Sequence, residues 1–312
     1  MKNTPAHTPL PGFQYARSQF EELVDLALSH AKQLGAADAA AEVSEGAGLS
    51  VSVRKGELEN VERNRDKSLG VTVYLGQKRG NASTSDFSPA AVRQTVQAAY
   101  DIARFTAEDP TAGLPDEADI ETEQRDLDLF HPWNLDSATA IEIARSAEGA
   151  AFAVSKQIQN SDGASVSAHH AHFMMGTSHG FMGGYPFSRH YISCAPIANE
   201  GGKQGLMQRD DWYSSSRIPG ELADPQAIGK YAAQRALSRL HAKSLSTRKC
   251  PVIFEAPLAA GLLGSLVQAV SGGALYRRSS FLLDSLGKQV LPKHLSLFEN
   301  PHLLSITGSA PF

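Results

Sequence analysis

The chain has 312 residues, of which 42% are apolar, and its 29 basic and 33 acidic side chains leave a net charge of −4. This length supplies enough apolar material for two domains or one large one. The acidic balance disfavours nucleic acid as the main partner, because phosphate binding needs a clustered basic surface. No apolar run approaches the roughly 20 residues that span a bilayer, so we expect no membrane partner.

The N-terminal residues and the cysteine count indicate the compartment. Residues 1–14 hold one lysine, three prolines and no apolar stretch of the kind found in signal peptides. The two cysteines, Cys194 and Cys250, are too few for a disulfide framework. Together these features predict a protein of the reducing cytoplasm.

The composition divides the chain into four parts. A flexible arm over 1–15 precedes an N-terminal α+β domain over 16–105, in which two helices pack on an antiparallel sheet. Ten acids, one base and three prolines over 106–136 predict a solvated acidic linker. A β-rich second domain with interspersed helices follows over 137–312, for an overall α+β class. Because the chain stops at Phe312 without a helix stop or a polar tail, we expect this domain to be truncated at its C-terminus.

Hydrophobic periodicity predicts the elements of the first domain. Apolar residues recur at helical spacing over 20–34, and Ser18 with Glu21 is typical of a capping box, so a helix should begin there. Over 39–85 the period changes to two, which predicts an antiparallel meander with one buried face. Ser88-Pro89 then predicts the start of a second helix.

The second domain mixes helices and strands. We predict a third helix over 137–154 and strands with turns over 158–208, where no helical period is present. A fourth helix should begin at Asp224-Pro225. A short buried strand is expected over 250–254, followed by a helix over 255–269.

One short motif suggests a serine nucleophile. Residues 176–180 match the Gly-x-Ser-x-Gly pattern, which places Ser178 at its centre. That pattern works where a strand turns sharply into a helix, but the two glycines and the proline in 181–186 disfavour a helix. We therefore predict that Ser178 lies in a β-turn and is not a nucleophile.

A histidine cluster suggests a metal site. His169, His170 and His172 lie close together, and on a strand His170 and His172 would share a face, as metal ligands do. No Glu or Cys accompanies them at a recognisable ligand spacing. We favour a polar strand surface or a subunit contact, and a metal held by His170 and His172 is the alternative.

Several segments match one family in the same order along the chain. They are Gly-Val-Thr-Val-Tyr at 70–74, Gly-Asn-Ala-Ser-Thr-Ser-Asp at 80–86, the turn at 178–185, Val-Ile-Phe at 252–254, and the stretch at 272–287. The part of the last stretch from Tyr276 to Gly287 is the most specific, because long ungapped matches seldom arise by chance. The chain resembles the TldD/PmbA family of cytoplasmic peptidase proteins, most closely its PmbA (TldE) branch, from about residue 20 to residue 312.

The resemblance implies where a metal site should lie. In the TldD branch a helix carries a His-Glu-x-x-x-His motif just before Gly-Leu-x-Gly, and here 261–264 reads Gly-Leu-Leu-Gly. The two ligand positions then fall on Glu255 and Ala260, and the general-base position falls on Ala256. Shifting the register by one residue leaves a phenylalanine and an alanine at the histidine positions. The resemblance therefore implies that this chain holds no metal and has no catalytic residue.

The resemblance also implies a role. The chain would be a non-catalytic PmbA-like subunit of a cytoplasmic metalloprotease, shaping a chamber for unfolded peptides and gripping them by strand addition to a sheet edge. Zn²⁺ would then be expected on a TldD-like partner subunit. The alternatives are an autonomous metallopeptidase that uses the histidine cluster, a serine hydrolase that uses Ser178, and a homodimeric binding protein.

Overall fold

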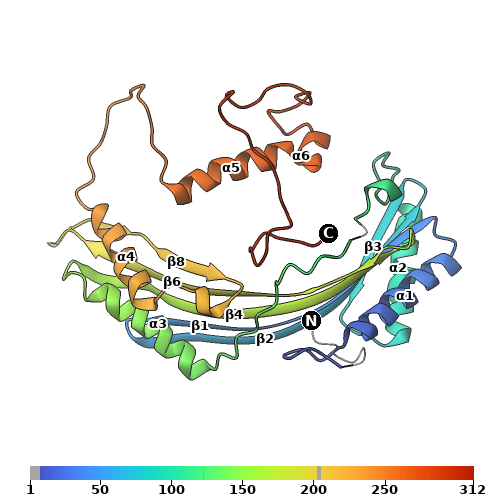
Figure 1. The fold of residues 1–312 in the computed structure, drawn as a ribbon, viewed down its shortest axis with the longest axis horizontal. Coiled ribbons are helices and arrows are strands. Elements are labelled where there is room, and N and C mark those ends of the chain that lie inside the picture. The colour runs from blue at the N-terminus through green and yellow to red at the C-terminus, as the bar shows by residue number, and fades with distance from the viewer. Residues whose placement is uncertain (1–7, 122, 202–204) are drawn as a thin grey trace. The chain divides into compact units, whose positions relative to one another are not determined.

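The structure is a computed structural model that describes residues 8–121, 123–201 and 205–312. Its contacts divide the chain into unit 1, which runs up to His241 and resumes at Pro301–Phe312, and unit 2, which is Ala242–Asn300. The elements in chain order are α1 (Arg17–Gln33), β1 (Asp38–Arg54), β2 (Glu57–Leu75), β3 (Lys78–Thr84), α2 (Pro89–Phe105), a 3₁₀ turn (Glu117–Asp119), α3 (Ser137–Phe152), β4 (Ile158–Thr177), β5 (Met182–Gly183), β6 (Pro186–Asn199), β7 (Met207–Arg209), β8 (Trp212–Ser216), a second 3₁₀ turn (Pro219–Glu221), α4 (Pro225–Ser238), α5 (Ala256–Val270) and α6 (Gly272–Tyr276) (Figure 1).

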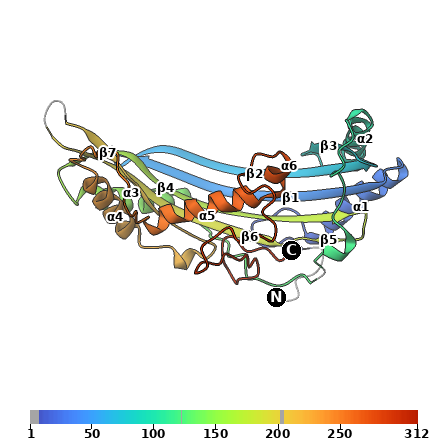
Figure 2. The ribbon, with the colours of Figure 1, turned by 90° about the horizontal axis from the view of Figure 1, so that it is seen from above.

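Unit 1 is built on one antiparallel sheet. Its described strands follow the order β3-β2-β1-β4-β6-β7, with β5 beside β4 and β8 beside β6. The strand β1 pairs with both β2 and β4, so that Val51 stands opposite Val61 on one side and Val166 on the other. Figure 2 shows these long strands side by side. The meander predicted over 39–85 and the α+β class are both confirmed.

Two hydrophobic cores lie on the same face of the sheet. The odd-numbered residues of β1 point to this face, because side chains alternate along a strand. At one end Val43 packs with Phe20 beneath α1 and α2, and at the other end Val51 packs with Ile228 beneath α3 and α4. The two helix pairs are therefore separated along the sheet (Figure 1).

Between the two cores, the positions that face the helices become polar. After Val43, the next such residue of β1 is Glu45, which stands opposite His172 of β4. On β6 the corresponding residues are Ser188 and His190. All four polar side chains are buried. Because buried polar groups are normally hydrogen-bonded, this polar band needs specific partners.

Three helices begin where the sequence predicts. Ser88, Asp136 and Asp224 are the N-caps of α2, α3 and α4. Their side-chain oxygens accept hydrogen bonds from the backbone N–H three residues further on, at 3.3, 2.7 and 2.9 Å. Each cap satisfies one of the backbone donors that a helix start leaves unpaired.

The first helix begins earlier than predicted. Its N-cap is Ala16, and the side chain of Gln19 accepts a hydrogen bond from the Ala16 amide at 2.8 Å. The predicted capping box of Ser18 and Glu21 is wrong, because both residues lie inside α1. Glu21 instead accepts a hydrogen bond from Arg17 Nε at 2.9 Å, as an i,i+4 ion pair.

The strand predicted over 250–254 is also wrong. These residues have no regular structure and are exposed, with Ile253 at 97% exposure. An apolar run becomes a buried strand only where a neighbouring strand can pair with it, and the described part of unit 2 contains no strand. The helix predicted after this run is present as α5.

The compact units differ from the predicted domains. The pairing of β1 with β4 joins the segments 16–105 and 137–312 in one sheet, so the acidic segment 106–136 does not separate the two units. Part of the arm predicted over 1–15 is also packed, since Phe13 is buried. The first seven residues lie outside the described ranges.

Candidate functional site

The positions at which the resemblance implies a metal motif lie at the start of α5. Glu255 is its N-cap, with a backbone carbonyl that accepts hydrogen bonds from the amides of Leu258 and Ala259 at 2.9 and 2.8 Å. Ala256 and Ala260 follow within the helix, and all three motif positions are exposed. Catalytic zinc sites use three protein ligands, whereas these positions supply one carboxylate and two methyl groups. These residues therefore do not fit a zinc ion.

The predicted metal alternative lies in the polar band of unit 1. His170 and His172 share a face of β4, as expected, and both contact the ring of Phe13, with centroids 5.1 and 4.1 Å away. His170 Nε2 lies 3.4 Å from the carbonyl oxygen of Gly12. His169 points to the other face and lies 3.3 Å from Ser50 Oγ. Over the described ranges, no three His, Cys, Asp or Glu side chains are grouped so as to hold a metal ion.

His172 is part of an aromatic stack. The centroid of its ring lies 4.3 Å from that of Phe20, with the two rings nearly parallel, and 4.1 Å from that of Phe13, whose ring is tilted by 38°. Its Nε2 is 3.4 Å from Glu45 Oε1, without hydrogen-bond geometry. Burial lowers the pKa of His172 below its ordinary value, because the imidazolium would lose its hydration, and the carboxylate of Glu45 opposes this shift.

Glu45 positions the start of α1. Its carboxylate is 3% exposed and accepts hydrogen bonds from the amides of Gln14 and Tyr15, at 2.5 and 3.3 Å. These amides immediately precede the helix, where a negative charge also interacts favourably with the helix dipole. The sequence analysis missed this residue. The signal was present, because Glu45 occupies an inward position in the alternation of Ala41, Val43, Ala47 and Leu49.

Ser178 lies in a turn between β4 and β5, as predicted. Its Oγ donates a hydrogen bond to Asp38 Oδ1 at 3.2 Å and accepts one from the amide of Ala39 at 3.1 Å. His179 Nε2 contacts the same Asp38 oxygen at 2.8 Å. Asp38 therefore binds both Ser178 and His179 and stabilises the turn. His179 does not form a hydrogen bond with the serine oxygen, as a general base would.

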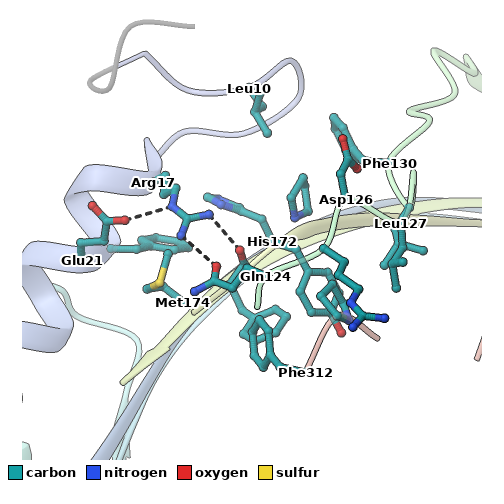
Figure 3. Close-up of a pocket in the computed structure, with 18 of the residues that line it drawn as sticks. Leu10, Arg17, Glu21, Gln124, Asp126, Leu127, Phe130, His172, Met174 and Phe312 are labelled. Carbon is teal, nitrogen blue, oxygen red and sulfur yellow. Dashed lines mark hydrogen bonds and ion pairs between the residues drawn. The ribbon is translucent and has the colours of Figure 1, made fainter. Parts of the chain in front are cut away.

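A cavity of about 990 Å³ opens beside the polar band, wholly within unit 1. It lies between the arm, the start of α1, the extended segment 124–130, β4 and the C-terminal segment (Figure 3). Its walls are mainly apolar and aromatic, formed by Leu10, Tyr15, Phe20, Leu127, Leu129, Phe130, Phe173, Met174, Tyr185, Pro186, Pro311 and Phe312. His172 also lines it, so the buried stack forms part of its wall.

Arg17 stands at the rim of this cavity. Its guanidinium donates hydrogen bonds to Glu21 at 2.9 Å, to the carbonyl of Gly184 at 3.0 Å and to Gln124 Oε1 at 3.4 Å (Figure 3). The second rim cation, Arg125, contacts Glu123 at 3.0 Å and His302 at 2.9 Å. Both cations are thus held by partners within the chain.

Arg217 fixes the C-terminal segment that closes the cavity. Its guanidinium is buried and donates hydrogen bonds to the backbone carbonyls of Ile306, Thr307 and Ser188, at 3.0, 2.8 and 3.3 Å. Burial lowers the pKa of this arginine below its ordinary value. The segment held in this way carries Phe312 to the cavity wall.

Matches to known proteins decide the family. Residues 39–103, 130–240 and 247–312 match the family models described as PmbA/TldA metallopeptidase domain 1, central domain and C-terminal domain. The chain is 47% identical over 297 residues to the metalloprotease PmbA of Escherichia coli O157:H7, and the match covers 95% of this chain. The chain belongs to the PmbA branch of the TldD/PmbA family. The expected resemblance is confirmed, and the chain spans 65% of the length of that relative.

One further relative agrees with this membership, and a solved structure shares the fold. The metalloprotease PmbA homolog of Haemophilus influenzae is 41% identical over 308 residues, which cover 99% of this chain and 67% of the homolog. A solved structure of a proposed modulator of DNA gyrase from Bacteroides thetaiotaomicron has the same fold. It superposes with a TM-score of 0.85 at 22% identity, over 93% of this chain and 66% of that protein. None of the helices within the described ranges is long and apolar enough to cross a membrane.

Proposed function

We propose that this member of the PmbA branch is a non-catalytic subunit of a TldD/PmbA-type metalloprotease and works with a TldD-type chain that carries the zinc. The observation behind this proposal is the donor set at the start of α5, where Glu255, Ala256 and Ala260 stand at the motif positions. A zinc peptidase needs ligands for the ion and a base to activate the bound water, and a single carboxylate cannot supply both.

In this role the chain would shape a chamber for unfolded peptides and bind them by strand addition. The outer edge of β2 supports such binding. The strand β3 pairs with β2 only over Leu69–Leu75, so over the described ranges residues 57–68 have a strand partner on one side only. Such an edge presents backbone donors and acceptors to an added strand. We place this activity in the cytoplasm, in keeping with two cysteines that are both free.

Reconstitution tests the proposal. The chain purified alone should contain no stoichiometric zinc and should cleave no unfolded peptide. Adding a TldD-type chain should give a heteromeric species that cleaves the peptide. As a control, replacing the motif glutamate of that partner with glutamine should abolish cleavage, whereas Glu255→Gln in this chain should leave it unchanged. Chelator-sensitive cleavage by this chain alone would contradict the proposal.

The same preparation tests the two remaining alternatives. An autonomous metallopeptidase that uses His170 and His172 would lose its zinc in the His170→Ala, His172→Ala double variant. A homodimeric binding protein would self-associate and would not join the TldD-type chain. Sedimentation of the mixture at several concentrations separates the second case from a heteromer.

A further inference from the structure

We propose that the cavity beside α1 binds an uncharged aromatic side chain presented by an extended polypeptide. This inference rests on the proposed role in handling peptides and deepens it, because it names the feature of an unfolded chain that is recognised. Aromatic side chains are buried in folded proteins and exposed in unfolded ones. A subunit that selects unfolded substrate therefore gains from a pocket that takes them.

The size and walls of the cavity suit such a group. Its volume of about 990 Å³ lies at the upper end of the range for ligand pockets and exceeds what one side chain fills. Tyr15, Phe130, Phe173 and Tyr185 line it and are only half-buried, so parts of their rings remain available for contact. Rings of this kind favour aromatic partners in edge-to-face or offset geometry.

The charges at the rim match a neutral ligand. Arg17 is paired with Glu21, and Arg125 is paired with Glu123, at 2.9 and 3.0 Å. Asp128 accepts a hydrogen bond from Ser305 Oγ at 3.0 Å and contacts His131 at 3.1 Å. Asp126, another acid of the lining, accepts a hydrogen bond from the Asp128 amide at 3.1 Å. An anionic side chain would have to break one of the pairs around Arg17 and Arg125, and any charged side chain would lose hydration against the apolar walls. These features favour an uncharged side chain, and a lysine peptide tests whether Asp126 binds a cation instead.

The chain itself shows the binding geometry on the adjoining wall. The ring of Phe312 lies 5.1 Å from Phe181 and 5.6 Å from Tyr185, both in edge-to-face arrangement. It is carried there by a segment without regular structure, and Pro311 beside it is buried. An aromatic side chain on a segment without regular structure therefore already packs against this site.

Peptide binding to the full chain, without any partner subunit, tests the inference. The probes are acetyl-Gly-Ala-Phe-Ala-Gly-amide and the same peptide with alanine, lysine or glutamate at the central position, and binding is measured by calorimetry. We expect the phenylalanine peptide to bind about tenfold more tightly than the other three, because this difference in affinity corresponds to the energy of one or two aromatic contacts. Equal affinity of the phenylalanine and alanine peptides would overturn the inference.

Two pairs of variants locate the binding. Phe130→Ala removes a half-buried ring from the wall, and its control Phe105→Ala removes a ring that is 85% exposed at the end of α2. Leu10→Trp fills the cavity from the arm, and its control Leu245→Trp adds the same bulk at a position that is 75% exposed and does not line the cavity. Phe130→Ala and Leu10→Trp should each weaken binding about 3- to 10-fold, and the controls should leave it unchanged.

The outcomes separate this inference from the proposed function. Circular dichroism establishes whether each variant is folded. If Phe130→Ala does not fold, Leu10→Trp alone tests the cavity. Equal losses in a variant and its control would overturn the cavity as the binding site. If selective aromatic binding is found but no TldD-type chain joins the protein, the cavity assignment stands and the subunit role fails. If the heteromer cleaves peptide but the chain alone shows no preference for the phenylalanine peptide in the binding assay, the subunit role stands and the cavity assignment fails.

Discussion

Two carboxylates in this protein have opposite surroundings. The resemblance implies that Glu255 stands where the TldD branch has a metal ligand, yet Glu255 is exposed at the start of α5, and the two other positions implied for the motif are alanines. Glu45 matches no motif, yet it is 3% exposed and accepts hydrogen bonds from two amides. The comparison teaches that a place in a family motif does not give a residue structural importance, whereas burial with specific partners does.

The largest effect should come from removing the buried carboxylate. Glu45→Ala leaves the amides of Gln14 and Tyr15 without their acceptor and leaves His172 without its charged neighbour. We expect the free energy of unfolding to fall by about 2–4 kcal/mol, since a hydrogen bond to a charged group contributes about 1.5–3 kcal/mol and the second of the two bonds is long, at 3.3 Å. Urea denaturation followed by circular dichroism measures this change.

A conservative variant sharpens this prediction. Glu45→Gln keeps an acceptor oxygen for the amides but removes the charge, so it should cost about half as much as Glu45→Ala. Equal losses in the two variants would mean that the charge, and not the hydrogen bonding, holds the start of α1. No loss in either would show that the contacts at Glu45 do not stabilise the fold.

An intermediate effect should appear as a dependence on pH. Burial lowers the pKa of His172 below the ordinary value of 6.5. The unfolded chain therefore binds a proton in a range where the folded chain does not. The free energy of unfolding should therefore be unaffected by His172 above pH 6.5. It should decrease as the pH falls below that value, with a slope of at most about 1.4 kcal/mol per pH unit for one group. Denaturation curves between pH 5 and 7.5 should show the decline.

Two measurements assign this decline to His172. The variant His172→Phe keeps a ring against Phe13 and Phe20 but cannot titrate, so its stability should fall less steeply with acid. The remaining slope should include His190, whose pKa is also lowered by burial. Glu45, Lys67 and His170 face this group from β1, β2 and β4, so the titration of His172 should be followed directly by NMR. A midpoint above 6.5 would contradict the prediction.

The contrast between local and long-range signals explains what the sequence could predict. The caps Ser88, Asp136 and Asp224 act on amides three residues away, so their helices could be placed from sequence. The alternation in β1 likewise revealed a half-buried strand. Only the tertiary fold showed why Ser18 is not a cap, because the amides just before α1 bind Glu45, about 30 residues further along the chain.

Contacts between distant segments explain what was missed at the candidate site. Glu45 and His172 meet only through the pairing of β1 with β4, which no local pattern specifies. The cavity likewise needs segments from both ends of unit 1, and the C-terminal one is held there by Arg217. The motif positions expected at Glu255, Ala256 and Ala260, by contrast, are close together in sequence, so the family resemblance alone is enough to predict them.

The smallest effect should come from the exposed carboxylate. Because the side chain of Glu255 is exposed and makes no capping hydrogen bond to α5, Glu255→Gln should change the free energy of unfolding by no more than about 0.5 kcal/mol, as surface substitutions usually do. Zinc content measured by atomic emission should be the same in this variant and in the parent chain.

A stability loss as large as that of Glu45→Ala would mean that the exposed Glu255 stabilises the fold as much as the buried Glu45 does. A loss of bound zinc would mean that the single carboxylate, with ligands from elsewhere, does hold the ion. Either result would remove the distinction between the two carboxylates, and the second would also remove the observation on which the non-catalytic role is based.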